Sequence, residues 1–237
     1  MDELPTPIAP PPVDLGRRLV AEGIGSALLV VAVIGSGITA ETLSPDDVGL
    51  QLLENAAATA GALIGLIVMF ATVSGAHFNP AVTLVERLLS TMSTRDAAAY
   101  ALVQVVGGCI GAILANAMFT ARTGLGWVSV STRSRDSGGE LLAEVVATIG
   151  LILVIHGAVR HARPHVVAVA VGVWIGGAYF FTSSTSFANP MIAVARTLSD
   201  TFAGIAPASA PGFVAAQVVG ALVATALVRY LFAPTRR

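Results

Sequence analysis

A short Asn-Pro motif occurs twice in this chain, each time at the end of a long apolar stretch. The two copies consist of Asn79, Pro80 and Ala81, and of Asn189, Pro190 and Met191. Asn is a favourable N-cap, because its side chain accepts hydrogen bonds from the first free amides of a helix, and Pro suits the first helical position. Each copy therefore predicts that one helix stops and that a short new helix begins.

The composition places these interrupted helices in a membrane. Of the 237 residues, 55% are hydrophobic and only 11% are charged, whereas about a quarter of a typical soluble domain is charged. Irregular backbone at membrane depth is tolerated only where it lines a cavity or is buried in protein. The formal net charge of −1 and the absence of basic tracts argue against a nucleic-acid partner.

Six stretches are long enough to cross a bilayer, which takes about 20 apolar residues. They cover approximately residues 17–40, 49–73, 96–120, 139–160, 165–182 and 209–233. Two shorter apolar segments, at 79–90 and 189–199, begin at the Asn-Pro motifs and are predicted to be half-helices that dip into the membrane. The Pro-rich segment 1–16 is predicted to be a disordered tail, which leaves 17–233 as a single membrane domain.

The chain contains two halves of one design. An Ala-Glu pair ends at Glu22 and again at Glu144, and a Gln-Val-Val-Gly segment begins at Gln104 and again at Gln217. With the Asn-Pro motifs, three landmarks recur in the same order, so residues of about 17–120 and 139–233 form two repeats. Each repeat has three spans, an odd number, so the second must be inverted. Inverted repeats place their site at their interface, near the midplane.

The basic residues predict the orientation. All 13 are Arg, and six spans put both termini on one side of the membrane. Nine of the Arg residues fall on that side, and the other four are Arg122, Arg133, Arg135 and Arg196. Because basic residues favour the cytoplasmic side, we expect a multi-pass protein of the inner (plasma) membrane with both termini in the cytoplasm.

These features resemble those of the aquaporin (major intrinsic protein) family, and the resemblance runs from Arg17 to Arg229. It implies an all-α membrane protein with six transmembrane helices and two re-entrant half-helices. It also implies a passive channel for water and small uncharged solutes that excludes ions and protons, assembled as a homotetramer in the lipid bilayer. No metal-ligand cluster, nucleophile motif or phosphate loop is present in the sequence, so no enzyme, cofactor or metal is predicted.

In such a fold the two half-helices meet with their N-termini at the centre of the pore. Each N-terminus carries roughly half a positive charge from its aligned peptide dipoles, so the centre repels protons and cations. Asn79 and Asn189 are expected to point an amide N–H into the pore. They can also cap the helices, because an Asn side chain has two donors and one acceptor.

The chain departs from the family at the expected constriction. Typical members have Arg three residues after the second motif's Asn, where this chain has Ile192. By spacing from the motifs, the resemblance places the other constriction residues at Thr59, Gly177 and Ser186. These small residues predict a wide constriction without a cation, which would admit glycerol, urea or neutral metalloid hydroxides such as arsenous acid.

Arg196 lies one helical turn beyond Ile192, and two interpretations of it stay open. Its side chain either reaches into the outer mouth and partly replaces the missing cation, or lies on the surface and pairs with Asp200, four residues further on.

Glu22 and Glu144 lie inside predicted spans, where a carboxylate normally has a partner. The resemblance implies that they accept hydrogen bonds from the re-entrant loops and fix them. The alternative is a proton relay, which would make the protein a secondary transporter of a small solute. His77, two residues before Asn79, is expected to support the first loop.

Overall fold

The computed structural model describes residues 13–161 and 164–232, which form eight α-helices and one 3-10 turn. The helices are α1 (Leu15–Leu43), α2 (Val48–Ser74), α3 (Pro80–Leu88), α4 (Thr94–Thr123), α5 (Gly138–Val159), α6 (Pro164–Phe181), α7 (Pro190–Ala195) and α8 (Ala210–Leu231), and the turn η1 covers Arg196–Leu198. Five helices are long and apolar enough to span a membrane, and α6 adds a shorter apolar segment, His165–Phe181. The predicted six long helices and two half-helices are confirmed.

Local capping sets where the long helices begin. The side chains of Asp14, Asp47, Ser93 and Ser137 each accept a hydrogen bond from a backbone N–H in the first turn of α1, α2, α4 and α5. Because of Asp14, α1 begins at Leu15, inside the segment 1–16 that the sequence predicted to be disordered. The rest of that predicted tail, residues 1–12, lies outside the described residues.

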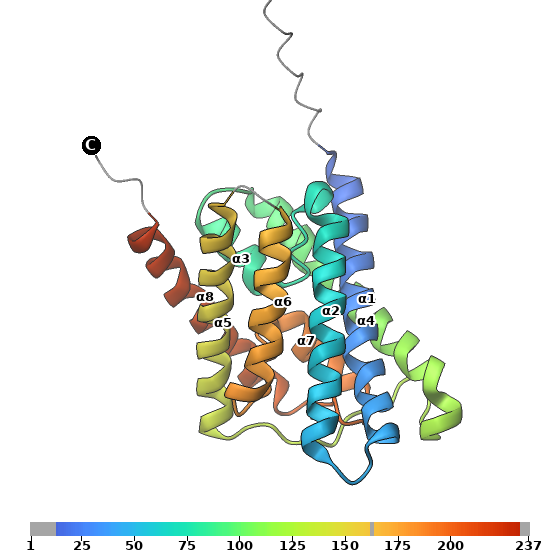
Figure 1. Cartoon of the computed structure of the whole chain (residues 1–237). Coiled ribbons are helices and arrows are strands. Elements are labelled where there is room, and N and C mark those ends of the chain that lie inside the picture. Colours follow the sequence, from blue (N-terminus) through green and yellow to red (C-terminus); the bar gives the residue numbers. More distant parts are fainter. Residues whose placement is uncertain (1–12, 162–163, 233–237) are drawn as a thin grey trace, which may run out of the picture.

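The two repeats pack in the same way. In the first, α1 contacts both α2 and α4, and in the second α5 contacts both α6 and α8. Each half-helix packs on a helix of the other repeat, α3 against α8 and α7 against α4. Figure 1 shows that α1 begins and α8 ends at the same end of the bundle, with α3 nearer that end and α7 nearer the opposite one. This is the arrangement that an inverted repeat requires.

Small residues bring the helices of each repeat together. A Cβ atom on Gly107 or Gly111 of α4 would overlap the backbone of Gly23 or Ala27 of α1. Close approach of this kind is how helices associate in lipid, where burial of apolar side chains gives no advantage. The glycines therefore fix the distance between α1 and α4.

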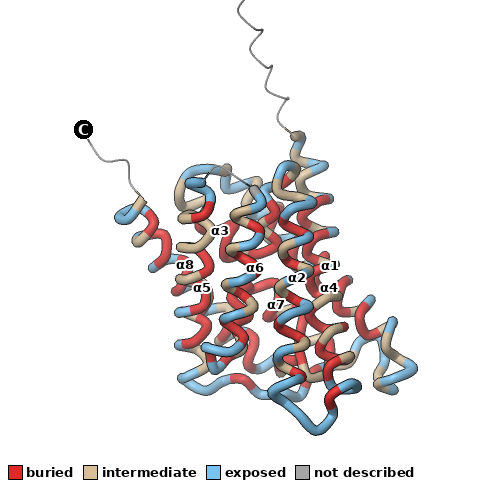
Figure 2. Tube along the Cα trace, in the orientation of Figure 1, coloured by how far each residue is buried: buried red, intermediate tan, exposed pale blue. Residues whose placement is uncertain are grey.

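Figure 2 shows exposed positions along the outer helices, and many of these exposed residues are large and apolar. On α4 the exposed residues at four-residue spacing are Leu102, Val106, Ile110, Leu114 and Met118. The interior, in contrast, contains fully buried polar side chains, among them Glu22, Gln104, Glu144 and Gln217. A bundle with apolar residues outside and buried polar side chains inside suits a lipid environment. Its polar groups are therefore inside the bundle, away from lipid.

Candidate functional site: a cavity between the two half-helices

The Asn-Pro motifs start the half-helices as their sequence predicts. Asn79 precedes α3, and its Oδ1 accepts a hydrogen bond from the N–H of Ala81 at 2.8 Å. Asn189 precedes α7, and its Oδ1 accepts from the N–H of Met191 at 3.0 Å. Both Asn residues are extended, with φ of −155° and −158°, and Pro occupies the first helical position after each.

The two Asn side chains also connect the halves of the chain. Nδ2 of Asn79 donates to the carbonyl O of Ala188 at 2.8 Å, and Nδ2 of Asn189 donates to the carbonyl O of Phe78 at 2.9 Å. Each carbonyl belongs to the residue immediately before the other Asn. The N-termini of α3 and α7 are therefore held together by a reciprocal pair of hydrogen bonds.

The loops before the motifs have the same unusual backbone. Ala76 and Phe78 precede Asn79 by three residues and by one, and their φ angles are 52° and 47°. Ser186 and Ala188 precede Asn189 by the same spacings, with φ angles of 49° and 47°. A left-handed residue other than Gly costs about 1–2 kcal/mol, so such loops persist only when other contacts hold them.

Glu22 supplies those contacts in the first half. Its Oε1 accepts hydrogen bonds from Ser74 Oγ at 2.6 Å and from the N–H of His77 at 3.0 Å. Its Oε2 accepts from the N–H of Phe78 at 2.7 Å and from Gln104 Nε2 at 2.8 Å. The carboxylate thus receives four donors, two of them from the strained loop.

Glu144 does the same in the second half. Its two oxygens accept hydrogen bonds from the N–H of Phe187 at 2.9 Å, from the N–H of Ala188 at 2.8 Å, and from Gln217 Nε2 at 2.6 Å. Like Glu22, it is fully buried and is not part of the cavity lining. Both glutamates therefore lie behind the loops, where they bind backbone amides.

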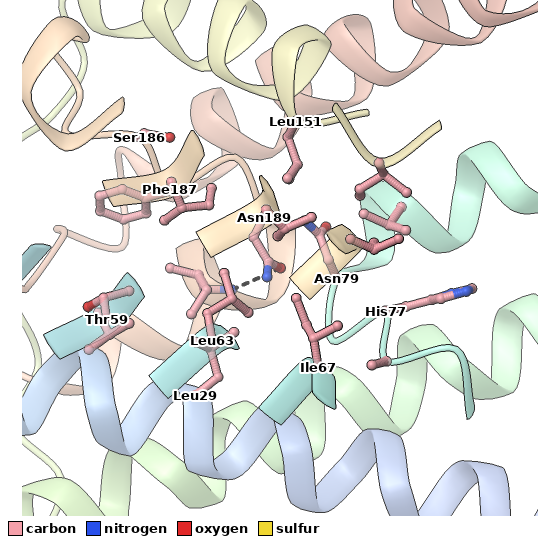
Figure 3. Close-up of a pocket in the computed structure, with 18 of the residues that line it drawn as sticks. Leu29, Thr59, Leu63, Ile67, His77, Asn79, Leu151, Ser186, Phe187 and Asn189 are labelled. Atoms are coloured by element: carbon pink, nitrogen blue, oxygen red, sulfur yellow. Dashed lines mark hydrogen bonds between the residues drawn. The ribbon is translucent and has the colours of Figure 1, made fainter. Parts of the chain in front are cut away.

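A cavity of about 180 Å³ runs past the two Asn residues. Figure 3 shows Thr59, Ser186 and Phe187 toward one end, Asn79 and Asn189 in the middle, and His77 toward the other end. Most of the remaining wall is aliphatic and comes from α1, α2, α5 and α6: Leu29, Val33, Leu63, Ile67, Leu151, Ile155, Val167, Val171 and Ile175. Of the six motif residues, only the two Asn residues line the cavity.

Tyr179 lines the cavity beside Thr59. Its hydroxyl donates to Thr59 Oγ1 at 3.2 Å, and both side chains are buried. Ser186 lies toward the same end (Figure 3), and its Oγ has no hydrogen-bond partner among the described residues; Ile192 also lines the cavity. The cavity lining therefore includes three side chains with hydroxyl groups, those of Thr59, Tyr179 and Ser186, and the aliphatic side chain of Ile192.

Gly177 does not belong to this constriction, and the prediction for it is wrong. Ile175 and Tyr179 line the cavity, whereas Gly177 lies between them in the sequence and is exposed on the outside of the bundle. Two positions along an α-helix amount to a rotation of about 200°, so a small error in counting back from Asn189 exchanges the inner face for the outer one. The structure has a tyrosine ring where the sequence predicted open space.

Arg196 points inward. The residue is 2% exposed, lines the cavity, and places its Cζ 3.6 Å from the centre of the Phe187 ring. Its Nε donates to the carbonyl O of Ala203. The alternative of a surface pair with Asp200 is wrong, because Asp200 Oδ1 instead accepts from the N–H of Thr132 at 2.9 Å.

The other end of the cavity is more polar than the sequence suggested. His77 lines it, and its Nδ1 lies 3.0 Å from Thr83 Oγ1 on α3. Glu86, also on α3, lines it too, and Glu86 Oε1 lies 3.5 Å from His156 Nε2 on α5. Glu86 lies seven residues after Asn79, so its position two helical turns along α3 was the available signal.

Met191, the residue that departs from the first motif, packs away from the cavity. It is fully buried, and a Cβ atom on Gly108 of α4 would overlap its side chain. In the other repeat, Ala81 corresponds to Met191. Ala221, four residues after Gln217, corresponds to Gly108, four residues after Gln104. The larger residue in one motif is therefore accommodated by the absence of a side chain on the facing helix.

We expect Gly108→Ala to lower the free energy of unfolding by about 1–3 kcal/mol, the usual effect of overfilling a packed core. The same change should not destabilise a Met191→Ala protein, because the space for the new methyl group is then free. Thermal unfolding in detergent measures both, with Gly61→Ala as the control, since a Cβ there has no atom within 4 Å. Equal destabilisation by Gly108→Ala in both backgrounds would contradict the packing argument.

Comparison with known proteins agrees with this geometry. The sequence profile of the family described as "Major intrinsic protein" matches residues 12–186. The aquaglyceroporin AqpS of Rhizobium meliloti is 46% identical over 223 residues, which cover 94% of this chain and 93% of that protein. The probable aquaporin AqpM of Archaeoglobus fulgidus is 28% identical over 92% of this chain and 97% of its own length.

The fold has a solved counterpart as well. The X-ray structure of the aquaglyceroporin from Plasmodium falciparum superimposes with a TM-score of 0.76 at 19% sequence identity. The match covers 93% of this chain and 98% of that structure, which confirms the aquaporin fold. With the paired half-helices and the cavity between them, the match over residues 12–186 shows that this chain belongs to the major intrinsic protein family of membrane channels.

Proposed function

We propose that this protein is a passive channel for water and small uncharged solutes, with the cavity between α3 and α7 as its pore. The observation that carries the proposal is the pair of Asn residues, which line the cavity and bind each other's loop. One N–H of each amide is used in that bond, which leaves the second for a passing molecule. The aliphatic wall offers nothing that would hold the molecule there.

Charge selectivity follows from the same geometry. The N-termini of α3 and α7 meet at the Asn pair, and both present the positive ends of their dipoles to the pore. A water molecule at this point accepts hydrogen bonds from the Asn amides and so donates its own protons away from the centre, which interrupts a chain of waters that could conduct protons. Barriers of this kind, together with pore diameter, determine selectivity in such channels.

The constriction supports solutes that carry hydroxyl groups on a small carbon skeleton. Thr59, Tyr179 and Ser186 offer hydroxyls, Arg196 offers guanidinium donors, and Ile192 offers an apolar surface. Glycerol has both kinds of surface, and AqpS is named an aquaglyceroporin. Because Tyr179 takes the place of the predicted open space, we propose water and glycerol as the principal solutes, ahead of urea and neutral metalloid hydroxides.

The positions of Glu22 and Glu144 do not support the alternative of a secondary transporter coupled through these glutamates. Coupling would need an ionisable group that faces the pore and exchanges protons, but Glu22 and Glu144 lie outside the cavity lining and bind loop amides. We further propose that the channel lies in the plasma membrane with both termini in the cytoplasm, in agreement with the distribution of Arg. Its exposed apolar faces are suited to lipid and to neighbouring copies in a homotetramer.

Stopped-flow measurements on proteoliposomes test the proposal. Water and glycerol should each cross faster than in protein-free liposomes, down their own gradients and independently of any proton or sodium gradient. Thr59→Trp, which fills the cavity, should abolish both fluxes, whereas Ala57→Trp on the exposed face of α2 should leave them unchanged. Accumulation of solute against its gradient when a proton gradient is applied would replace the channel by a transporter.

A further inference from the structure

A second arginine lies beside the constriction and is buried, although the sequence places it in a connecting loop. Arg135 is 7% exposed and belongs to the segment between α4 and α5. Its Nε donates to the carbonyl O of Gly204 at 3.1 Å and its Nη1 to the carbonyl O of Ser184 at 3.3 Å. Its backbone N–H donates to Ser209 Oγ at 3.0 Å. Both the side chain and the backbone of Arg135 are therefore fixed.

Arg135 and Arg196 share one aromatic ring. The Cζ atom of Arg135 lies 5.3 Å from the centre of the Phe187 ring, and that of Arg196 lies 3.6 Å from it. Phe187 lines the pore, its N–H is bound by Glu144, and its ring packs edge-on against Phe213 at 5.0 Å. The ring is thus held by its backbone, by its edge and by two guanidinium groups.

Two cations this close to one ring repel each other, so the arrangement needs compensation. The negative face of the ring attracts both guanidinium groups, and carbonyl oxygens accept from each of them: Gly204 and Ser184 from Arg135, and Ala203 from Arg196. Burial lowers the pKa of Arg135 to about 10, so the side chain remains charged at neutral pH. Both side chains line one recess at the outer side of the constriction.

We propose that Arg135 is a second fixed cation of the outer mouth, which positions Phe187 and Arg196 and excludes cations from the pore together with Arg196. The proposal rests on the proposed channel function. Ile192 removes the cation that typical members of the family carry at that position, and two arginines from elsewhere in the chain lie around the same point. A buried charge acts over a longer distance than an exposed one, because less solvent screens it.

Arg133 provides a matched control. It lies two residues away, lines the same recess, donates from Nη1 to the carbonyl O of Phe202 at 3.0 Å, and places its Cζ 5.3 Å from the Phe202 ring. It has the same kinds of contact as Arg135 but is exposed. A charge in contact with water should contribute little to the barrier inside the pore.

The experiment compares potassium flux, driven by a membrane potential into liposomes that contain a potassium-sensitive dye, with osmotic water permeability in the same preparation. Arg135→Gln should raise potassium flux about tenfold, within the range in which local charge changes ion concentration at a cleft, and should change water permeability much less. Arg135→Lys should retain most of the exclusion, and Arg133→Gln should behave as the unchanged protein.

Arg135→His separates charge from structure within one folded variant. Its potassium flux should be low at pH 5 and rise toward pH 8 as the imidazole loses its charge. The charged and titratable neighbours are Arg133, Arg196, Glu140, Glu144 and Tyr179, and the unchanged protein, measured over the same pH range, controls for them. A purely structural role would give a flux that does not follow pH.

Two results would overturn the proposal: an Arg135→Gln protein that conducts water normally and still excludes potassium, or an Arg135→His protein whose potassium flux is the same at pH 5 and pH 8. Failure of the proposed function looks different, because the unchanged protein would then conduct no water. If Arg135→Gln does not fold, the pH dependence of Arg135→His decides the question alone.

Discussion

Replacing Tyr179 with Ala should raise the ratio of glycerol permeability to water permeability by roughly tenfold, a typical effect of changing the size of a side chain in a selective site. The tyrosine ring narrows the pore beside Thr59, to which its hydroxyl donates at 3.2 Å. Its removal widens the constriction, and a wider pore favours the larger solute more than water, which already passes. Stopped-flow light scattering with osmotic gradients of glycerol and of an impermeant sugar measures the ratio.

Gly177→His is the control for this experiment. Gly177 lies on the exposed face of α6, so an added imidazole should meet the surroundings of the bundle and leave both permeabilities unchanged. The sequence analysis instead placed Gly177 in the constriction, where a larger side chain would reduce glycerol flux. Loss of glycerol flux in Gly177→His, together with unchanged permeabilities in Tyr179→Ala, would show that residue 177 and not Tyr179 lines the constriction.

Of the substitutions proposed, Glu144→Ala should lower the free energy of unfolding most, by at least about 3 kcal/mol. The substitution leaves three buried donors without an acceptor, the N–H groups of Phe187 and Ala188 and Nε2 of Gln217, and each buried donor left unpaired costs about 1–3 kcal/mol. The loop also contains left-handed residues at 186 and 188, which have no reason to persist once their amides are released. We expect a lower unfolding temperature in detergent and loss of water permeability.

A carboxylate with fewer contacts serves as the comparison. Glu54 on α2 is half-buried, and its Oε1 accepts from Ser44 Oγ at 2.9 Å. Glu54→Ala should therefore lower the free energy of unfolding by about 1.5 kcal/mol, the lower value for one hydrogen bond to a charged group. If Glu144→Ala instead has the unfolding temperature of the unchanged protein but alters the dependence of flux on a proton gradient, the loop-supporting role is wrong. The interpretation of Glu144 as a proton relay would then be the better one.

The beginnings of the half-helices were predictable because their cause is local. Asn followed by Pro specifies a cap and a first turn within two residues, and α3 and α7 begin at Pro80 and Pro190. The ends of the long helices were less predictable, because hydropathy changes gradually whereas caps act at single residues. Asp14 and Ser93 begin α1 and α4 two residues earlier than the apolar pattern suggested.

The constriction was only partly predictable. Thr59, Ser186 and Ile192 line the cavity, and the motifs place them through short segments or through a helix of known face. The prediction for Gly177 was wrong because a loop of several residues separates α6 from Asn189. Counting residues through such a loop does not determine which face of α6 points inward. Phe187 and Arg135 meet across 52 positions of the sequence, and no local pattern records that contact.

The hydrogen bonds from each Asn side chain to a backbone carbonyl of the other loop also bear on the order of folding during synthesis. Asn79 donates to a carbonyl that lies 109 residues later in the chain, so during synthesis α3 reaches the membrane while its partner is still unmade. Glu22, by contrast, binds donors that all lie between Ser74 and Gln104, and so can shape the first loop as soon as α4 is inserted. During synthesis the first loop can therefore form before the second loop exists. A chain that ends before Ala188 would lack both hydrogen bonds between the loops, and the cavity between α3 and α7 could not form.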